Sequence, residues 1–145
     1  MEITTKLEFD AGHRIPHHKS VCRNLHGHRY IIEVTIKGEV ISDKSNEDFG
    51  MVMDFKDAKD LIKKTIVDEW DHSFIVYKDD SKVLDFLNSI DKHKTVIFPL
   101  VPTAENMALV AMDKLKIAFT KAFKLSIMPA KVRLYETPNN WADAY

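Results

Sequence analysis

Three histidines stand at spacings that allow them to bind one metal ion. His26 and His28 are two residues apart at the start of a segment in which polar and apolar residues alternate, so both imidazoles point to the same side of a strand. His13 lies just beyond an earlier alternating segment, and pairing of the two segments brings its ring beside the other two. Three neutral imidazoles suit zinc and leave one coordination position for water or substrate, as in catalytic sites. The spacing therefore predicts a catalytic zinc site at these histidines.

The alternative is a polar loop that is rich in histidine without binding metal. The adjacent pair His17 and His18 is interpreted in this way, because neighbouring side chains on an extended chain point in opposite directions. We predict that these two residues are solvated and are not ligands.

Cys22 is the only cysteine and precedes His26 by four positions. Free cysteines are often small buried hydrophobic residues, which is one interpretation of this residue. Here, however, Lys19 and Arg23 stand close by in the sequence, and positive charge favours the thiolate. We predict a general base or nucleophile beside the metal site.

A second acid-base pair is formed by Asp71 and His72. An aspartate that orients an imidazole makes it a better proton carrier near neutral pH. The alternative is that Asp71 caps a turn while His72 packs beneath Trp70. The sequence leaves both possibilities open.

Two glutamates are further candidates for substrate binding. Glu136 ends a predicted strand just before Pro138, where a carboxylate could accept two hydrogen bonds from the guanidine-like edge of a heterocycle. A solvated strand end is the alternative. Glu105 falls in the first turn of a predicted helix, a position that the helix dipole explains.

The elements that must position these residues follow from hydrophobic periodicity. Residues 2–10 and 29–40 alternate as two antiparallel strands, and the connection between them carries five of the seven histidines and the cysteine. Helical spacing predicts a helix over residues 55–68 capped by Asp54, and another from Thr103 to about residue 124. The remaining predictions are a short helix (81–90), a short strand or extended loop (95–100) and a strand (130–136).

This order of elements predicts a single α+β domain over residues 1–145, with both long helices on one face of an antiparallel sheet. A sheet of this size leaves open edges, which favours association with other copies of the chain.

Composition narrows the function further. The 145 residues carry a net charge of −1, so no overall field attracts nucleic acid or an anionic membrane. No window reaches the roughly 20 apolar residues of a membrane-spanning helix, and the first residues lack the apolar stretch of a secretory signal. A lone thiol suits a reducing compartment. We expect a soluble cytoplasmic protein that binds neither nucleic acid nor membrane.

Six ordered blocks of sequence carry a family resemblance. They are residues 9–14 (FDAGHR), 22–28 (CRNLHGH), 50–55 (GMVMDF), 71–72 (DH), 102–106 (PTAEN) and 135–138 (YETP). Together they resemble the 6-pyruvoyltetrahydropterin synthase family over nearly the whole chain. The three residues between Cys22 and the His-Gly-His run, and the C-terminal end with Trp141, Ala142 and Tyr145, are similar to its bacterial 6-carboxy-5,6,7,8-tetrahydropterin synthase branch.

The resemblance implies a tunnelling fold, in which sheets from several subunits, typically six, close into a barrel with active sites at subunit interfaces. The implied reaction converts 7,8-dihydroneopterin triphosphate to 6-carboxy-5,6,7,8-tetrahydropterin with loss of acetaldehyde and triphosphate, on the route to queuosine. The implied roles are zinc binding, proton transfer and pterin binding. Zinc binding falls to His13, His26 and His28. Proton transfer falls to Cys22, Asp71 and His72, and pterin binding to Glu136, Glu105 and Thr103. The triphosphate requires local positive charge, for which the candidates are Arg14, Lys19, Arg23 and Arg29.

Two alternatives stay open. The pyruvoyl branch uses the same residues but retains the three-carbon side chain of the substrate. A noncatalytic metal-binding or pterin-binding module would leave Cys22 and His72 as bystanders.

Overall fold

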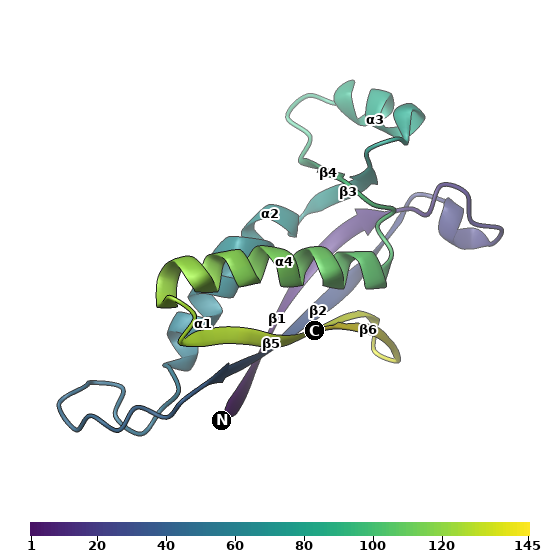
Figure 1. The fold of residues 1–145 in the computed structure, drawn as a ribbon. Coiled ribbons are helices and arrows are strands. Elements are labelled where there is room, and N and C mark those ends of the chain that lie inside the picture. Colours follow the sequence, from purple (N-terminus) through teal and green to yellow (C-terminus); the bar gives the residue numbers. More distant parts are fainter.

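The centre of the molecule is a six-stranded sheet with the strand order β4-β3-β1-β2-β5-β6 (Figure 1). A computed structural model describes the whole chain, residues 1–145. The strands are β1 (Glu2–His13), β2 (His26–Gly38), β3 (Ser73–Tyr77), β4 (Thr95–Phe98), β5 (Ile127–Thr137) and β6 (Asn140–Ala144). The helical elements are a 3-10 turn η1 (Val21–Arg23), α1 (Phe55–Ile62), a π-helical turn η2 (Lys63–Val67), α2 (Asp68–Trp70), α3 (Ser81–Asn88) and α4 (Ala104–Phe123).

β1 and β2 form the predicted antiparallel pair. Their register places Phe9 opposite Tyr30 and His13 opposite His26. Phe9 and Tyr30 are both buried, and their rings stack with centroids 5.1 Å apart. Both strands extend further toward the connecting loop than periodicity predicts. All three metal-candidate histidines therefore lie on regular, paired backbone.

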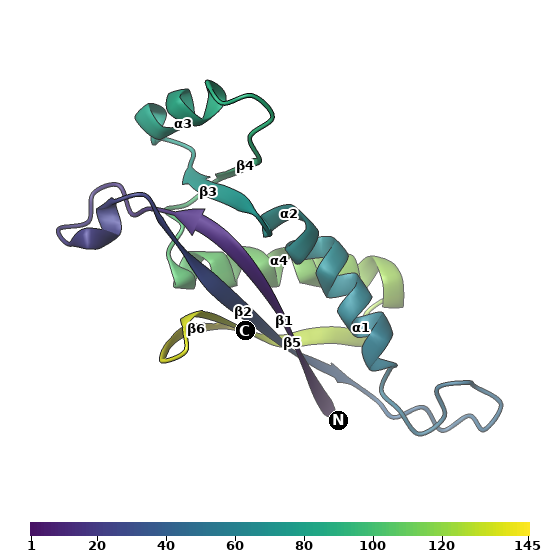
Figure 2. The same ribbon diagram turned by 180° about the vertical axis from the view of Figure 1, so that it is seen from behind.

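The two long helical segments, α1 to α2 and α4, cover one face of the sheet, as predicted (Figure 2). α1, η2 and α2 continue one another, and the Asp54 carboxylate caps their start by accepting a hydrogen bond from Lys56 N at 2.7 Å. The Thr103 hydroxyl caps α4 by accepting one from Asn106 N at 3.4 Å. The hydrophobic core lies between this layer and the sheet, with Ile32 and Leu115 among its fully buried members. No helix combines the length and the apolar character needed to cross a membrane.

The sheet is mixed rather than entirely antiparallel. β1 and β3 are parallel neighbours, as are β3 and β4, and the sequence did not predict β3 or β6 at all. β3 is a short run with mostly apolar residues, for which periodicity does not distinguish strand from helix. β6 has only five residues, and it forms because the chain turns back after β5 and pairs with it. The predicted short elements near residues 81–90 and 95–100 are confirmed as α3 and β4.

The connection from β3 through α3 to β4 projects from the sheet and has a small core of its own, formed by Val76, Val83 and Leu87. An ion pair ties this connection to the end of β1. Arg14 Nε and Nη2 donate to the two carboxylate oxygens of Asp80 at 2.6 and 2.7 Å, and the Asp80 side chain is only 4% exposed. The pair fixes α3 next to the loop that follows His13.

The Arg14–Asp80 pair makes stability depend on pH. Hydrogen bonding from Arg14 holds the pKa of Asp80 below its ordinary value of 3.8. The pair therefore stabilises the fold fully above that value, and its contribution is lost as pH falls through the lower folded-state pKa. We expect Asp80→Asn to lower the free energy of unfolding by about 2 kcal/mol at pH 7, with the difference from wild type shrinking toward pH 3.

Urea denaturation at several pH values measures this difference. Asp79→Asn is the control, because the neighbouring Asp79 is exposed and forms no ion pair with Arg14. A difference that stays constant from pH 7 to pH 3 would contradict the assignment.

Candidate metal and substrate site

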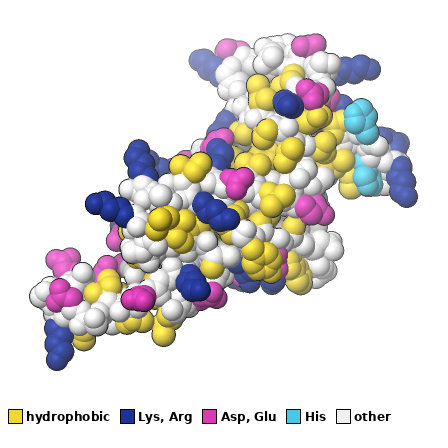
Figure 3. All heavy atoms as spheres, in the orientation of Figure 1, with side chains coloured by type: hydrophobic (Ala, Val, Ile, Leu, Met, Phe, Trp, Pro, Cys, Tyr) yellow, Lys and Arg dark blue, Asp and Glu magenta, His cyan; other side chains and the backbone are white.

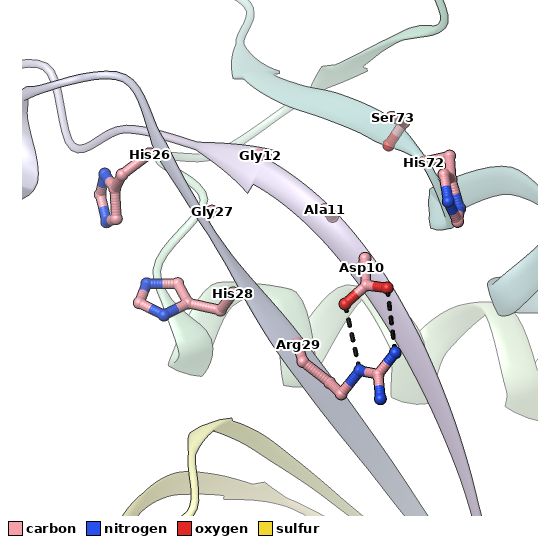
Figure 4. A pocket seen from close by; sticks show the side chains of 9 residues that line it. All are labelled: Asp10, Ala11, Gly12, His26, Gly27, His28, Arg29, His72 and Ser73. Carbon is pink, nitrogen blue, oxygen red and sulfur yellow. Dashed lines mark hydrogen bonds and ion pairs between the residues drawn. The ribbon is translucent and has the colours of Figure 1, made fainter.

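The three candidate ligands come together at the loop end of β1 and β2. One nitrogen from each of His13, His26 and His28 lies within 4.8 Å of the other two. The ring centroids are 4.6 Å apart for His13 and His26, 5.2 Å for His13 and His28, and 5.0 Å for His26 and His28. The arrangement follows from the strand register, since His13 pairs with His26 and side chains two apart on β2 share a face. Figure 4 shows His26 and His28 pointing to the same side of β2.

Backbone carbonyl groups orient two of the rings. His13 Nδ1 donates to Pro102 O at 2.7 Å, and His26 Nδ1 donates to Asn24 O at 2.8 Å. A carbonyl oxygen only accepts, so in the neutral ring the proton stands on Nδ1 and the lone pair on Nε2. This arrangement of outer hydrogen bonds is common for histidines that bind metal.

The Nε2 atom of His13 is the clearest sign of a ligand. The His13 side chain is 1% exposed and its Nε2 has no hydrogen-bond partner. A buried polar atom without a partner is costly, and a bound cation would satisfy it. Burial lowers the pKa of His13 to about 4, and burial likewise lowers the pKa of His28. Both rings are therefore neutral at pH 7, the form that binds metal, and the donor set fits a divalent ion.

A glycine allows the two strands to hold the histidines this closely. A Cβ atom on Gly27 would lie 2.8 Å from the carbonyl oxygen of Ala11 on β1. Any side chain at this position would force the strands apart. The residue between the two β2 histidines therefore has a structural reason to be glycine.

A pocket of about 220 Å³ opens beside the histidines. Of the residues predicted from the sequence, it is lined by His13, His26, Cys22, Glu136, Thr103 and Glu105. The structure therefore gathers three stretches that are far apart in the chain: residues 13–26, the entry to α4 and the end of β5. The Glu136 carboxylate is closest to the metal candidates, with Oε1 3.5 Å from His13 Nε2 and 3.9 Å from His28 Nε2.

The start of α4 contributes one wall of this pocket. Thr103 and Glu105 lie there, and Asn106 Nδ2 donates to Val101 O at 2.8 Å, which fixes the entry to the helix. The same entry supplies the Pro102 carbonyl that orients His13. The position of α4 and the orientation of the first histidine are thus coupled.

Five further lining residues were not predicted: Ile15, His18, Ala104, Asn140 and Trp141. His18 is exposed, as expected, but it stands at the mouth of the pocket, where its Nδ1 accepts a hydrogen bond from Ser20 Oγ at 2.8 Å. The position of His18 in the same loop as Cys22 was the sequence feature that could have indicated its place at the pocket. Asn140 and Trp141 reach the pocket through β6, a strand that periodicity did not reveal.

Asp71 and His72 form the predicted pair but lie elsewhere. His72 Nδ1 donates to Asp71 Oδ2 at 2.8 Å, and Asp71 Oδ1 accepts from Asp10 N at 3.0 Å. This backbone hydrogen bond is the main reason that the pKa of Asp71 is below its ordinary value. The alternative in which His72 packs beneath Trp70 is wrong, because Trp70 is fully buried and the His72 side chain is 78% exposed.

His72 lines an open groove of about 530 Å³ that also includes Asp10, Arg29, His26 and His28. It does not line the pocket that holds Cys22. It precedes β3, which pairs with the edge of β1 opposite β2, so β1 separates His72 from the strand that carries His26 and His28 (Figure 4). Within one chain, the structure does not bring the acid-base pair to the thiol.

Comparison with known proteins gives a consistent result. The family model described as 6-pyruvoyl tetrahydropterin synthase matches residues 2–145. A 6-carboxy-5,6,7,8-tetrahydropterin synthase of Rickettsia bellii is 37% identical over 140 residues, which cover 96% of each chain. The enzyme of the same name from Haemophilus influenzae is 34% identical over 145 residues, covering 98% of this chain and 96% of the relative.

A solved structure agrees with the fold. The 6-pyruvoyl tetrahydropterin synthase of Caenorhabditis elegans superimposes with a TM-score of 0.67 and 27% identity, covering 99% of this chain and 94% of the other. The tunnelling fold implied by the sequence is therefore the fold of this chain. Because the family model and these relatives match along almost the entire length, the chain belongs to the 6-pyruvoyl tetrahydropterin synthase family.

Proposed function

We propose that this chain is a zinc-dependent lyase that converts 7,8-dihydroneopterin triphosphate to 6-carboxy-5,6,7,8-tetrahydropterin in the cytoplasm, as a step toward queuosine. Acetaldehyde and triphosphate are the other products. Relatives at 34–37% identity over nearly the whole chain bear the corresponding name. The single observation that carries the proposal is the buried, unpartnered Nε2 of His13 in a pocket shared with Cys22 and Glu136.

His13, His26 and His28 are the proposed zinc ligands. Three histidines provide neutral nitrogen donors and leave one coordination position for the substrate. Bound zinc would act as a Lewis acid that makes the substrate's side-chain hydroxyl groups and the adjacent carbon more acidic.

Glu136 is the proposed anchor of the pterin. Its carboxylate lies in the pocket and can accept two parallel hydrogen bonds from the amino and ring N–H groups of the heterocycle. Thr103 and Glu105, at the start of α4, provide the neighbouring wall. This binding orients the pterin so that its side chain points toward the histidines and Cys22.

Proton transfer is assigned to Cys22 and His72. Cys22 lines the pocket and, as thiolate, removes a proton from the substrate side chain. The ring of His72 has its Nδ1 proton held by Asp71, which leaves Nε2 exposed to exchange a proton. Because β1 separates His72 from the Cys22 pocket, we assign this role to His72 of a second copy in a homo-oligomer, for which a hexamer is the expected form. The unpaired edges of β4 and β6 favour such association.

The zinc site predicts a specific loss of metal. We expect His13→Ala and His28→Ala each to lower zinc affinity by more than about a hundredfold, since loss of even an outer-shell partner costs ten- to a hundredfold. His93→Ala is the matched control, because the ring of His93 hydrogen bonds to Thr95 and does not belong to the cluster. Competition with a chromophoric chelator measures the affinities. Equal affinity in the control and the ligand variants would refute the site.

The reaction predicts defined products and a catalytic role for the thiol. Zinc-loaded protein incubated with 7,8-dihydroneopterin triphosphate should release acetaldehyde and triphosphate in equal amounts, as followed by mass spectrometry. Cys22→Ala should lower turnover by at least about a hundredfold, the usual minimum for a proton-transfer group, while zinc content is unchanged. A product that keeps its three-carbon side chain would identify the pyruvoyl reaction. The absence of turnover by the wild type, with zinc and pterin still bound, would indicate a noncatalytic module.

The shared site predicts complementation between two inactive variants. Cys22→Ala and His72→Asn are each expected to be inactive, and the mixed oligomer obtained by coexpression should recover about one quarter of wild-type activity, since one site in four draws both intact residues from different chains. Separately purified variants that are simply combined without subunit exchange serve as the control. If mixed oligomers stay inactive, both residues act within one chain.

A further inference from the structure

Positive charge is concentrated around the loop that joins β1 and β2. Residues 11–32 contain no aspartate or glutamate, although the chain as a whole carries a net charge of −1. The same stretch contains five histidines and four basic residues: Arg14, Lys19, Arg23 and Arg29. Figure 3 shows histidine and Lys or Arg side chains gathered at the end of the molecule where this loop projects. This concentration makes the loop the most suitable place for an anion.

Two of the four cations are already paired with carboxylates. Arg14 binds both oxygens of Asp80 at 2.6 and 2.7 Å. Arg29 lies 3.3 Å from an oxygen of Asp10 and 3.7 Å from one of Glu8. A further anion at either guanidinium group would be repelled by these carboxylates. Neither Arg14 nor Arg29 is therefore the main contact for a phosphate group.

Lys19 and Arg23 are different, because both are exposed and neither takes part in an ion pair. Their backbone positions are nevertheless fixed. Arg23 Nη1 donates to Lys19 O at 3.0 Å, and Ile15 N donates to Cys22 O at 2.9 Å, which folds the loop back on itself. The guanidinium group of Arg23 therefore lies against the backbone of Lys19.

This position is next to the substrate pocket. Lys19 follows His18 and Arg23 follows Cys22, and both His18 and Cys22 line the pocket. The other side of the loop, near α3, is less suitable, because Asp79 and Asp80 line it together with Lys82. Charge therefore favours the side of Lys19 and Arg23 for a polyanion that extends outward from a ligand in the pocket.

We propose that Lys19 and Arg23 bind the triphosphate group of the substrate at the mouth of the pocket. The inference rests on the proposed function for the identity of the ligand. Ammonium and guanidinium groups both form charge-assisted hydrogen bonds with phosphate oxygens. A triphosphate at the rim keeps its charge in contact with solvent while the pterin enters the pocket. After the reaction, the released triphosphate can leave without passing the histidines.

Binding of inorganic triphosphate, measured by isothermal titration calorimetry, tests the site without requiring turnover. We expect K19Q/R23Q to weaken binding about a hundredfold, or about tenfold for each positive charge that is removed. K78Q/K82Q removes the same charge from exposed lysines near α3 and should bind triphosphate as the wild type does. The titration is repeated on metal-free protein, because triphosphate also chelates divalent ions. The single variants K19Q and R23Q, checked for fold by circular dichroism, keep the test valid if the double variant misfolds.

The substrate provides the second measurement. K19Q/R23Q should raise KM for 7,8-dihydroneopterin triphosphate while leaving the affinity for unphosphorylated 7,8-dihydroneopterin unchanged. Unchanged triphosphate binding in K19Q/R23Q, or an equal loss in K78Q/K82Q, would overturn the proposal. If the wild type binds triphosphate through these residues but gives no products, the proposed function fails and the anion site stands.

Discussion

The buried ring of His13 is the constraint on which the site depends. Its Nδ1 is held by the Pro102 carbonyl at the entry to α4, and its Nε2, 3.5 Å from Glu136 Oε1, has no hydrogen-bond partner. Burial keeps the ring neutral by disfavouring the charged form, so the free lone pair is available for a cation. A histidine placed here without a metal would be a cost to the fold. The packing of β1, β2 and α4 therefore holds this ring in one orientation, in which Nε2 can bind a cation.

Strand pairing extends this constraint to the other ligands. The register that sets His13 opposite His26 also sets Ala11 opposite His28, and a slip by one residue would move the β2 histidines to the other face. Gly27 lets the strands approach between the two rings. His13, His26 and Glu136 line the pocket that holds Cys22, while His26 and His28 also border the open groove that contains Asp10, Arg29 and His72. The thiol and the Asp71–His72 pair therefore lie by two different hollows that both border His26.

The distribution of charge follows the same division. Carboxylates pair with Arg14 and Arg29 on both sides of the histidines, and the partly buried Arg14–Asp80 pair ties the loop to the start of α3. Lys19 and Arg23 carry their charge into solvent beside the pocket. A chain of nearly neutral net charge can therefore present a local positive surface to a polyanion, because screening and pairing act over short distances.

The sequence by itself determined the features that depend on local periodicity and local hydrogen bonds. Alternation predicted β1 and β2 and thereby the common face of His26 and His28, and the residues at helix entries predicted the caps at Asp54 and Thr103. The family resemblance supplied the roles of Cys22, His72 and Glu136, which periodicity does not give. The predictions of strands and helix caps succeed because their physical cause lies within a few residues, whereas the roles of Cys22, His72 and Glu136 remain proposals.

Only the tertiary structure decided which distant segments meet. β6 and the parallel placement of β3 depend on pairing with other strands, so neither was predicted. β6 contributes Asn140 and Trp141 to the lining of the pocket. The proximity of Glu136 to His13 and the separation of His72 from Cys22 are likewise consequences of strand order. Strand order is set by long-range burial of the shared core, and no local pattern of residues encodes it.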